Sequence, residues 1–408
     1  MKKRKLLFLI PIVILLAVYF GLYHQNKDLK YIPENADAIV LIDVKKLTRD
    51  YLSETLSHPS TWFEKSESKG KKSWLKSGVK IPDFVQFFHL KHENLSNWYT
   101  VLEIKDKEKL LSFLTAAKFQ KKPQNIYSNG RFSLKISGKL LLMGTYEKSF
   151  SQLEKAFTSS KNKIRNADDF VIKGFGVLGI LNEKKLEKYA INIGNDFIEI
   201  SNIPDFKTEK VPLLKNKNSQ HFLQADLDKA NLYLVSKLFK SDIFSDSNIN
   251  SLQLISDIKQ QNDTIIIYDY DDNFNEVEKI SYQKITQPQY FIQLKTKNTD
   301  AVWSDFKSKN QIDEKNQFTA IPFLPNKILK GKDHIVIHYK QHPTLKNESQ
   351  TNFILIKNNP LLLSSIKSLS ASDRKKLSEL EYIFYHNNEE KRVLRLQFKP
   401  NELPLILR

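Results

Sequence analysis

The chain has 408 residues, a net charge of +18 and no cysteine, and 40% of its residues are hydrophobic. This length and composition are typical of a folded protein with two domains, and the lack of cysteine excludes disulfides, thiolate metal sites and cysteine nucleophiles. Lysine supplies nearly all of the positive charge. Because nucleic-acid readers rely on arginine forks, we expect solvated lysine-rich surfaces and no nucleic-acid partner.

The N-terminal residues are expected to form a membrane anchor. A basic cluster at residues 2–5 precedes an uncharged, apolar segment at residues 6–23. As a helix with ~1.5 Å rise per residue, this segment reaches about 27 Å, close to the hydrocarbon thickness of a bilayer. Bulky residues such as Tyr19 and Phe20 stand where a signal peptidase needs small side chains. The segment is therefore predicted to be an uncleaved signal anchor, with a cleaved signal peptide as the alternative.

The charges around this segment predict its orientation. Four basic residues precede it and two lysines follow it closely, which places the N-terminus in the cytoplasm. We expect residues 1–30 to form a cytoplasmic tip and the anchor of a single-pass protein in a bacterial inner membrane. The periplasmic remainder is expected to form two domains, residues 31–205 and 206–408, joined by the lysine-rich stretch 207–219.

Apolar strands that end in a polar residue and lead into an amphipathic helix recur along the chain. Asp43, Asn182, Asp226 and Asn298 stand where an N-cap is expected. The expected strand–helix pairs are residues 38–43 with 44–56, 99–104 with 107–119, 139–145 with 147–157, 175–181 with 182–190, 221–225 with 226–239, 290–294 with 298–306, and 353–356 with 358–369.

Hairpin patterns lie between these units. The expected strand pairs are residues 131–137 with 139–145, 264–270 with 277–285, and 380–386 with 391–398. Neighbouring strands joined by short turns favour an α+β fold with mainly antiparallel sheets and packed helices, in two related halves, over a doubly wound parallel sheet.

Residues 31–47 (YIPENADAIVLIDVKKL) directly follow the export segment. They resemble the start of certain bacterial envelope proteins of unknown function, which open with Ile-Pro, then a strand that ends in Asp, and then a helix. The resemblance implies an envelope location and no defined activity. This chain departs from those relatives because it lacks both a lipoprotein cysteine and a cleavable signal.

Several motifs have the spacing of known sites but the wrong surroundings. Gly174, Gly176 and Gly179 match G-x-G-x-x-G, yet they lie in an apolar run, and the expected helix begins only after it, so a strand or bend is favoured over a dinucleotide site. Three S-x-x-K matches stand without the companion motifs of penicillin-recognising enzymes. We expect no cofactor.

The metal-site candidates have equally ordinary alternatives. His334 and His338 are four residues apart, but their alternating, β-branched context predicts a strand, on which they would lie ~13 Å apart. Asp269 and Asp271 belong to an oxygen-rich stretch that resembles a calcium loop, although Phe274 takes the place of its glycine. Ordinary strand histidines and a polar turn are therefore favoured over metal ligands.

One basic stretch is a candidate binding surface. Residues 65–80 combine six lysines with one tryptophan, and are expected to form an exposed loop or a short basic helix. Such a surface is suited to anionic lipid or polysaccharide. The candidate residues are Lys69, Lys71, Lys72, Trp74 and Lys76.

No set of residues in the sequence forms a coherent catalytic group. We therefore predict a membrane-anchored bacterial envelope protein that acts as a binding or scaffold module on the outer side of the inner membrane, more plausibly a non-enzyme than an enzyme. Its partner would be an envelope protein or an anionic lipid or polysaccharide. The alternatives are an exported enzyme that acts on cell-wall or lipid material, and a carrier of an apolar ligand.

Overall fold

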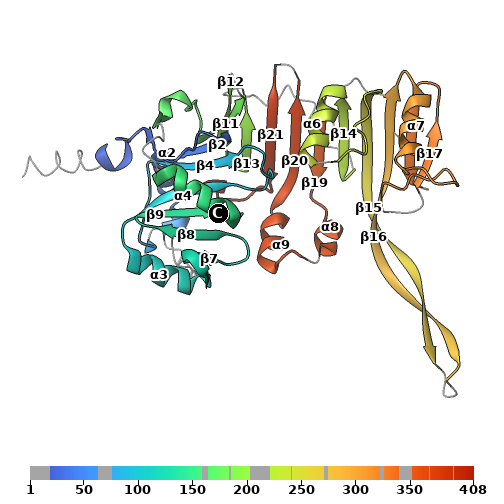
Figure 1. Cartoon of the computed structure of the whole chain (residues 1–408), viewed down its shortest axis with the longest axis horizontal. Helices are drawn as coiled ribbons and strands as arrows, with labels where there is room; N and C mark the ends of the chain where they lie inside the picture. Colours follow the sequence, from blue (N-terminus) through green and yellow to red (C-terminus); the bar gives the residue numbers. More distant parts are fainter. Residues whose placement is uncertain are drawn as a thin grey trace, which may run out of the picture. The chain divides into compact units, whose positions relative to one another are not determined.

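The computed structural model divides the chain into two compact units, Met1–Pro204 with Asn401–Arg408, and Asp205–Pro400 (Figure 1). The sequence-based ranges had assigned the last eight residues to the second half, whereas the structure assigns them to the first unit. The structure describes residues 19–62, 76–158, 164–182, 185–202, 221–239, 241–270, 274–321, 326–339, 352–366, 368–388 and 390–408.

The first unit is built on an antiparallel sheet. Register pairs give the strand order β13-β12-β11-β2-β4-β5-β9-β8-β7-β6, and β3 pairs with β5 on the same side as β4. The strands are β2 (Ala36–Asp43), β3 (Val79–Lys80), β4 (Phe84–Leu90), β5 (Tyr99–Ile104), β6 (Gln120–Lys122), β7 (Ile126–Ser128), β8 (Ser133–Ser137), β9 (Leu140–Gly144), β11 (Gly176–Asn182), β12 (Lys185–Ile193) and β13 (Phe197–Ser201).

Alternation along β5 divides the core of this unit between the two faces of the sheet. Tyr99 and Val101 pack into one buried cluster, whereas Leu102 and Ile104 pack against another. The remaining elements are α2 (Val44–Ser57), α3 (Lys107–Ala116), α4 (Phe150–Thr158), the pair β1 (Asp28–Leu29) and β10 (Arg165–Asn166), and the 3-10 helices η1 (Pro59–Trp62), η3 (Pro123–Asn125), η4 (Glu147–Ser149), η5 (Ala167–Asp169) and η7 (Leu405–Leu407).

The strands of the second unit are antiparallel and follow the order β21-β20-β19-β14-β15-β16-β18-β17. Its main core includes Leu294, Phe306, Phe318 and Ile337, all fully buried. The elements are β14 (Leu223–Asp228), α6 (Lys229–Phe239), β15 (Ile249–Tyr270), β16 (Glu276–Thr296), α7 (Thr299–Ser308), β17 (Asn326–Lys330), β18 (His334–Tyr339), β19 (Phe353–Lys357), α8 (Pro360–Ser365), α9 (Ala371–Ser378), β20 (Leu380–Asn387) and β21 (Arg392–Phe398).

These elements confirm the predicted α+β class with mainly antiparallel sheets. The predicted N-caps are confirmed at two helices, since the side chain of Asp43 accepts a hydrogen bond from Lys46 N and that of Asn298 accepts one from Ala301 N. The predicted strand at residues 334–339 and all three predicted hairpins are also present.

Two predictions about local structure are wrong. Most of the residues expected to form a helix at 182–190 belong instead to the strand β12. This strand pairs with β11 on one side and with β13 on the other. Asp226 is not a helix cap, because it lies within β14 and is 6% exposed. The turn into α6 comes two residues later, where a carboxylate oxygen of Asp228 accepts a hydrogen bond from Asn231 N at 2.8 Å.

Several predicted features lie outside the described residues, including the linker at 207–219 and most of the apolar segment at 6–23. Among the residues that the structure describes, no helix is both long and apolar enough to cross a membrane. The last part of the apolar segment is described, and residues 19–22 are helical.

Candidate functional site

The most distinctive surface of the second unit is a long hairpin formed by β15 and β16. β14 pairs with β15 only up to Ser256, and β18 pairs with β16 only from Phe291 onward. Beyond the Lys259–Gln287 pair the two strands continue to pair with each other as far as Tyr270 and Glu276. We call residues 259–287 the arm. Its eleven residue steps correspond to roughly 36 Å, and Figure 1 shows it projecting beyond the neighbouring strands of this unit.

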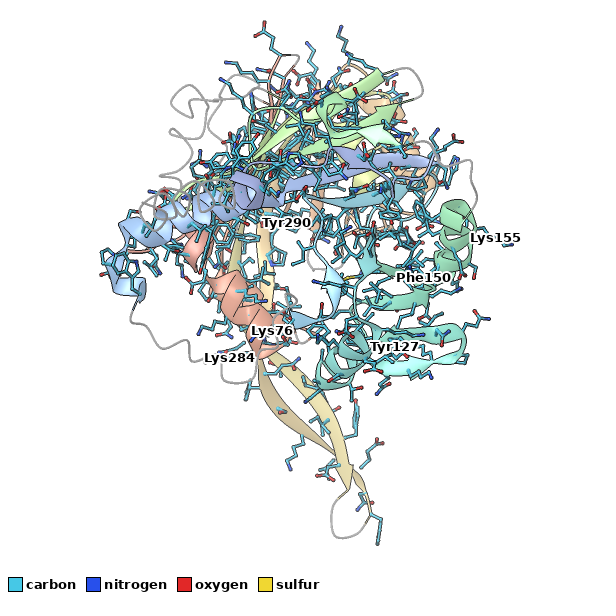
Figure 2. All side chains as sticks on the ribbon, turned by 90° about the vertical axis from the view of Figure 1, so that its left-hand side faces the viewer. Lys76, Tyr127, Phe150, Lys155, Lys284 and Tyr290 are labelled. Atoms are coloured by element: carbon cyan, nitrogen blue, oxygen red, sulfur yellow. The ribbon has the colours of Figure 1, made fainter. Side chains whose placement is uncertain are left out.

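A small polar cluster lies at the base of the arm. Gln287, which is 8% exposed, donates hydrogen bonds through Nε2 to Gln261 Oε1 at 2.7 Å and to the hydroxyl of Tyr339 at 2.8 Å. The Tyr339 hydroxyl donates in turn to Gln261 Oε1 at 3.2 Å. These bonds tie both strands of the arm to β18. In Figure 2, Lys284 lies on the arm and Tyr290 lies in the sheet from which the arm emerges.

One face of the arm carries exposed apolar and aromatic side chains. Ile266 lies directly opposite Ile280, and these side chains are 51% and 59% exposed. On the same face, Tyr268 and Tyr282 flank this pair and are 58% and 76% exposed. Isolated surface hydrophobics are ordinary, but a contiguous group of this kind marks an interaction surface. We call these four residues the arm patch.

The opposite face of the arm is more mixed. Ile267 lies opposite Lys279, and Asp269 lies opposite Val277. Lys279 Nζ is 3.7 Å from Asp269 Oδ2, so an exposed ion pair crosses this face diagonally. Apolar side chains continue here, because Ile267 and Val277 are 47% and 46% exposed.

The arm has the opposite charge to the rest of the chain. Residues 259–287 contain six acidic and three basic side chains, a net charge of −3, within a chain of net charge +18. An acidic, apolar surface of this kind attracts basic partners and repels a second arm.

The outer edge of β15 in the arm is open to a further strand. In the described part of the chain, no strand pairs with this edge beyond Ser256. Natural proteins protect such edges with lysine or proline. β16 has Lys279, Lys284 and Pro288, whereas residues 263–270 of β15 (DTIIIYDY) contain neither lysine nor proline. This stretch also has high β-propensity.

The candidate metal ligands, for which the sequence favours ordinary strand histidines and a polar turn, do not come together. His338 is in register with Phe291 and Asp269 with Val277, positions that are fourteen residues apart on β16 and therefore roughly 46 Å from each other. His334 Nδ1 is 2.8 Å from the carboxylate of its neighbour in sequence, Asp333, and this hydrogen bond lowers the pKa of that carboxyl. Within the described residues, no group of three or more potential metal ligands is present. Asp271 lies outside them.

Gly176 and Gly179 of the glycine motif lie in β11, and Gly174 lies in the bend that precedes this strand. β11 pairs with β2 and β12, so both of its edges are occupied. A Cβ atom at Gly176 would lie 2.4 Å from the carbonyl oxygen of Leu41. The close approach of two strands therefore accounts for this glycine.

The first unit contains a pocket of about 210 Å³, which is an alternative candidate site. Its lining includes Tyr31, Lys80 and Glu103. The carboxylate of Glu103 accepts hydrogen bonds from Lys80 Nζ at 2.9 Å and from the Tyr31 hydroxyl at 3.1 Å. The bond from Lys80 lowers the pKa of Glu103, and burial together with Glu103 raises the pKa of Tyr31 to about 12. The volume is below the ~300–1,000 Å³ of typical ligand sites, so this pocket gives little support to an enzyme or a carrier.

Of the five candidate residues of the predicted basic surface, only Lys76 is described, and its side chain is exposed. Lys69, Lys71, Lys72 and Trp74 lie outside the described residues. The sequence correctly predicts the distal strand segments of the arm, at residues 264–270 and 277–285. Residues 290–294, which continue the second of these strands, were predicted to be a separate strand. The missed signal is an uninterrupted run of β-forming residues on both sides of the turn, together with the local reversal of charge.

The chain was compared with known proteins at three levels. No protein-family model, no curated protein and no solved structure matches it.

Proposed function

We propose that this protein is a single-pass, membrane-anchored envelope protein that binds a partner protein through the arm. The apolar segment at residues 6–23 would hold the chain in the inner membrane, with the N-terminus in the cytoplasm and the two units in the periplasm. The observation that carries the proposal is the arm patch, an exposed apolar surface on a hairpin that projects from its sheet.

The partner is proposed to present an extended, lysine-rich segment that adds as a strand along the outer edge of β15. The backbone N–H and C=O groups along this edge, with which no described strand pairs, would supply hydrogen bonds. Asp263 and Asp269 lie on either side of the β-branched stretch at residues 264–267 and Tyr268, and would face lysines of the added strand. Apolar side chains of the partner would cover Ile266 and Tyr268 of the arm patch. Two arms would repel each other, so this contact favours a different, basic partner surface.

Fluorescence anisotropy of a labelled synthetic peptide tests this recognition. The peptide alternates lysine and valine over nine residues, and the control peptide replaces each lysine with glutamate. We expect the full chain in detergent to bind the lysine peptide and not the glutamate peptide. The affinity should fall at least about tenfold when salt is raised from 50 to 500 mM, because exposed charges are screened.

Two variants distinguish arm binding from general attraction between charges. The double variant Asp263→Lys with Asp269→Lys is expected to lose binding of the lysine peptide. Replacing Glu314→Lys together with Glu379→Lys changes the net charge equally at exposed positions elsewhere in the second unit and is expected to preserve binding. Equal loss of binding in both double variants would contradict recognition by the arm.

The anchor is tested separately on membranes that contain the full chain. An integral span remains in the membrane after washing with alkaline carbonate, whereas a peripheral protein is released. The predicted orientation requires that protease added to intact spheroplasts digests the two units. Release by carbonate, or protection from the protease, would overturn this part of the proposal.

A further inference from the structure

The end of the apolar segment is held by α2 in the first unit. Lys45 Nζ donates a hydrogen bond to the carbonyl of Phe20 at 2.9 Å and another to the carbonyl of His24. Arg49 donates to the carbonyl of Leu22, and its guanidinium lies 4.9 Å from the ring centroid of Tyr23. Two cations thus satisfy the free carbonyls at the C-terminal end of residues 19–22, where the helix dipole favours positive charge.

The same stripe of α2 continues into exposed leucines. Leu52 and Leu56 follow Lys45 by seven and eleven residues, which places them on one side of a helix. Their exposures are 41% and 69%. Tyr51 and Trp62 are also exposed, by 48% and 52%, although Tyr51 lies about 100° around the helix from Leu52.

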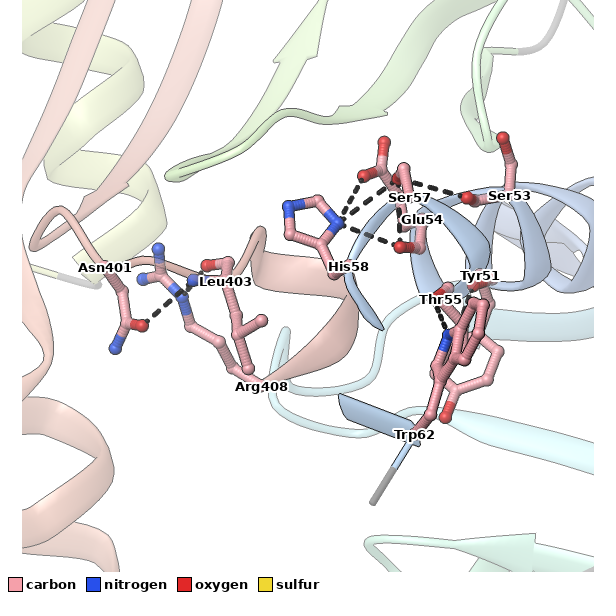
Figure 3. A network of polar contacts seen from close by, with 10 residues as sticks. All are labelled: Tyr51, Ser53, Glu54, Thr55, Ser57, His58, Trp62, Asn401, Leu403 and Arg408. Atoms are coloured by element: carbon pink, nitrogen blue, oxygen red, sulfur yellow. Dashed lines mark hydrogen bonds and ion pairs between the residues drawn. The ribbon is translucent and has the colours of Figure 1, made fainter. Parts of the chain in front are cut away.

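Two of the three leucines of α2, Leu52 and Leu56, lie on an exposed side of the helix. None of its residues is buried, although Asp50 and Glu54, on the other side from Leu52, are only half-exposed. Glu54 lies 3.5 Å from His58 Nδ1, and Figure 3 shows this polar group beside the end of the helix. Leu47 lies with Asp50 and Glu54 on the more sheltered side of α2, whereas Leu52 and Leu56 face outward, an arrangement that favours an apolar environment outside the protein.

The ring of Trp62 is fixed in this surface by η1, which follows α2. Its Nε1 donates a hydrogen bond to the carbonyl of Thr55 at 2.6 Å, as Figure 3 shows. The indole therefore has its polar group satisfied by the protein while half of the side chain remains exposed. Tryptophan and tyrosine with this balance of polar and apolar surface are enriched at the membrane–water interface.

We propose that the surface formed by Tyr51, Leu52, Leu56 and Trp62, here called the interfacial surface, rests on the phospholipid bilayer that holds residues 6–23. This inference rests on the proposed anchor. Seven residues of helix separate Arg49 from Leu56, about 10 Å, so the leucine stays close to the point where the anchor leaves the bilayer. Amphipathic helices insert their apolar face ~5–10 Å into the interface. The occupant is therefore the lipid surface, and not a second protein, because the covalent anchor already places this face against lipid.

The absence of cysteine allows a direct test with single-cysteine variants of the full chain. Leu56→Cys is labelled with the fluorophore NBD and reconstituted into vesicles of phosphatidylcholine and phosphatidylglycerol that contain brominated lipid. Ser57→Cys, an exposed position on another side of α2, and Tyr233→Cys, which is on α6 of the second unit and 62% exposed, are the controls. We expect quenching at residue 56 to exceed quenching at both controls by about twofold or more, since only that label would reach the acyl region.

The outcomes separate this inference from the proposed function. Equal quenching at residues 56 and 57, in vesicles that retain the protein after a carbonate wash, overturns the interfacial surface and leaves the anchor intact. Release by the wash overturns the anchor and, with it, the inference, while binding of the lysine peptide still reports on the arm. If brominated lipid does not quench the label at residue 56, but an added membrane protein shields this label from solvent, the surface binds a protein and the proposed contact with lipid is wrong.

Discussion

Ile266 and Ile280 face each other across the two strands of the arm, and both side chains are more than half exposed. Twelve residues further along the same strand, Ile292 is 3% exposed and belongs to the core of the second unit. One continuous strand therefore serves two purposes, because its proximal part stabilises the unit while its distal part presents an apolar surface to solvent. Mutations in the two parts should have separable effects.

The first prediction concerns this separation. Ile280→Ser should change the free energy of unfolding by no more than about 0.5 kcal/mol, because an exposed side chain loses few contacts. Ile292→Ala should cost about 2–5 kcal/mol, because it leaves a cavity in a packed core. Urea denaturation of the full chain in detergent measures both values. A loss of stability in Ile280→Ser comparable to that in Ile292→Ala would mean that the arm packs against something in the folded protein.

The hairpin also shows how far the sequence predicts this fold. Alternation and an Asp/Asn-rich turn correctly predict strands on both sides of residues 271–275. The full strand lengths could not be predicted, because the buried stretch at residues 290–294 also fits a separate strand at the start of a new unit. Register across several strands, which is a tertiary property, decides between these interpretations.

Local capping signals were similarly ambiguous. The sequence pattern places the N-cap of α6 at Asp226, although Asp228 also precedes the helical pattern. The structure selects Asp228, because β14 continues to that residue through its pairing with β15. The interfacial surface could not be predicted from the pattern of α2, since an amphipathic helix is expected to bury its leucines. The position of this surface follows from tertiary contacts, because Lys45 and Arg49 bind carbonyl groups at the end of the apolar segment.

The second prediction concerns the base of the arm. Tyr339→Phe removes the hydroxyl that links Gln287 and Gln261 and should cost about 1 kcal/mol. Backbone amides near these glutamines should also exchange faster with deuterium, because the arm loses its link to β18. Tyr290→Phe is the matched control, since the Tyr290 hydroxyl donates to Asn326 within the sheet. Unchanged exchange at the base in Tyr339→Phe would show that the cluster does not hold the arm.

The third prediction concerns the N-cap of α2. A carboxylate oxygen of Asp43 accepts hydrogen bonds from Lys46 N at 2.8 Å and from Gln25 Nε2 at 2.7 Å. Asp43→Ala loses both and should destabilise the first unit by about 1–2 kcal/mol, whereas Asp43→Asn should recover most of this loss. Thermal unfolding measures the effect. A variant with alanine that unfolds at the wild-type temperature would show that α2 is held in place by its other contacts alone.

The last prediction concerns pH and the cluster of Tyr31, Lys80 and Glu103. The pKa of Tyr31 rises from its ordinary value of 10.0 to about 12 in the folded protein, so its contribution to stability is complete below pH 10 and is lost as the pH rises from 10 to 12. The pKa of Glu103 is lowered, mainly by Lys80, so its contribution is present above its ordinary value and is lost as the pH falls through the lowered value. Urea midpoints measured between pH 9 and 12 should therefore fall less steeply in Tyr31→Phe than in the wild type. Tyr233→Phe, at an exposed position on α6, should follow the wild-type curve. Identical slopes for Tyr31→Phe and the wild type would show that the Tyr31 hydroxyl does not make the proposed contribution.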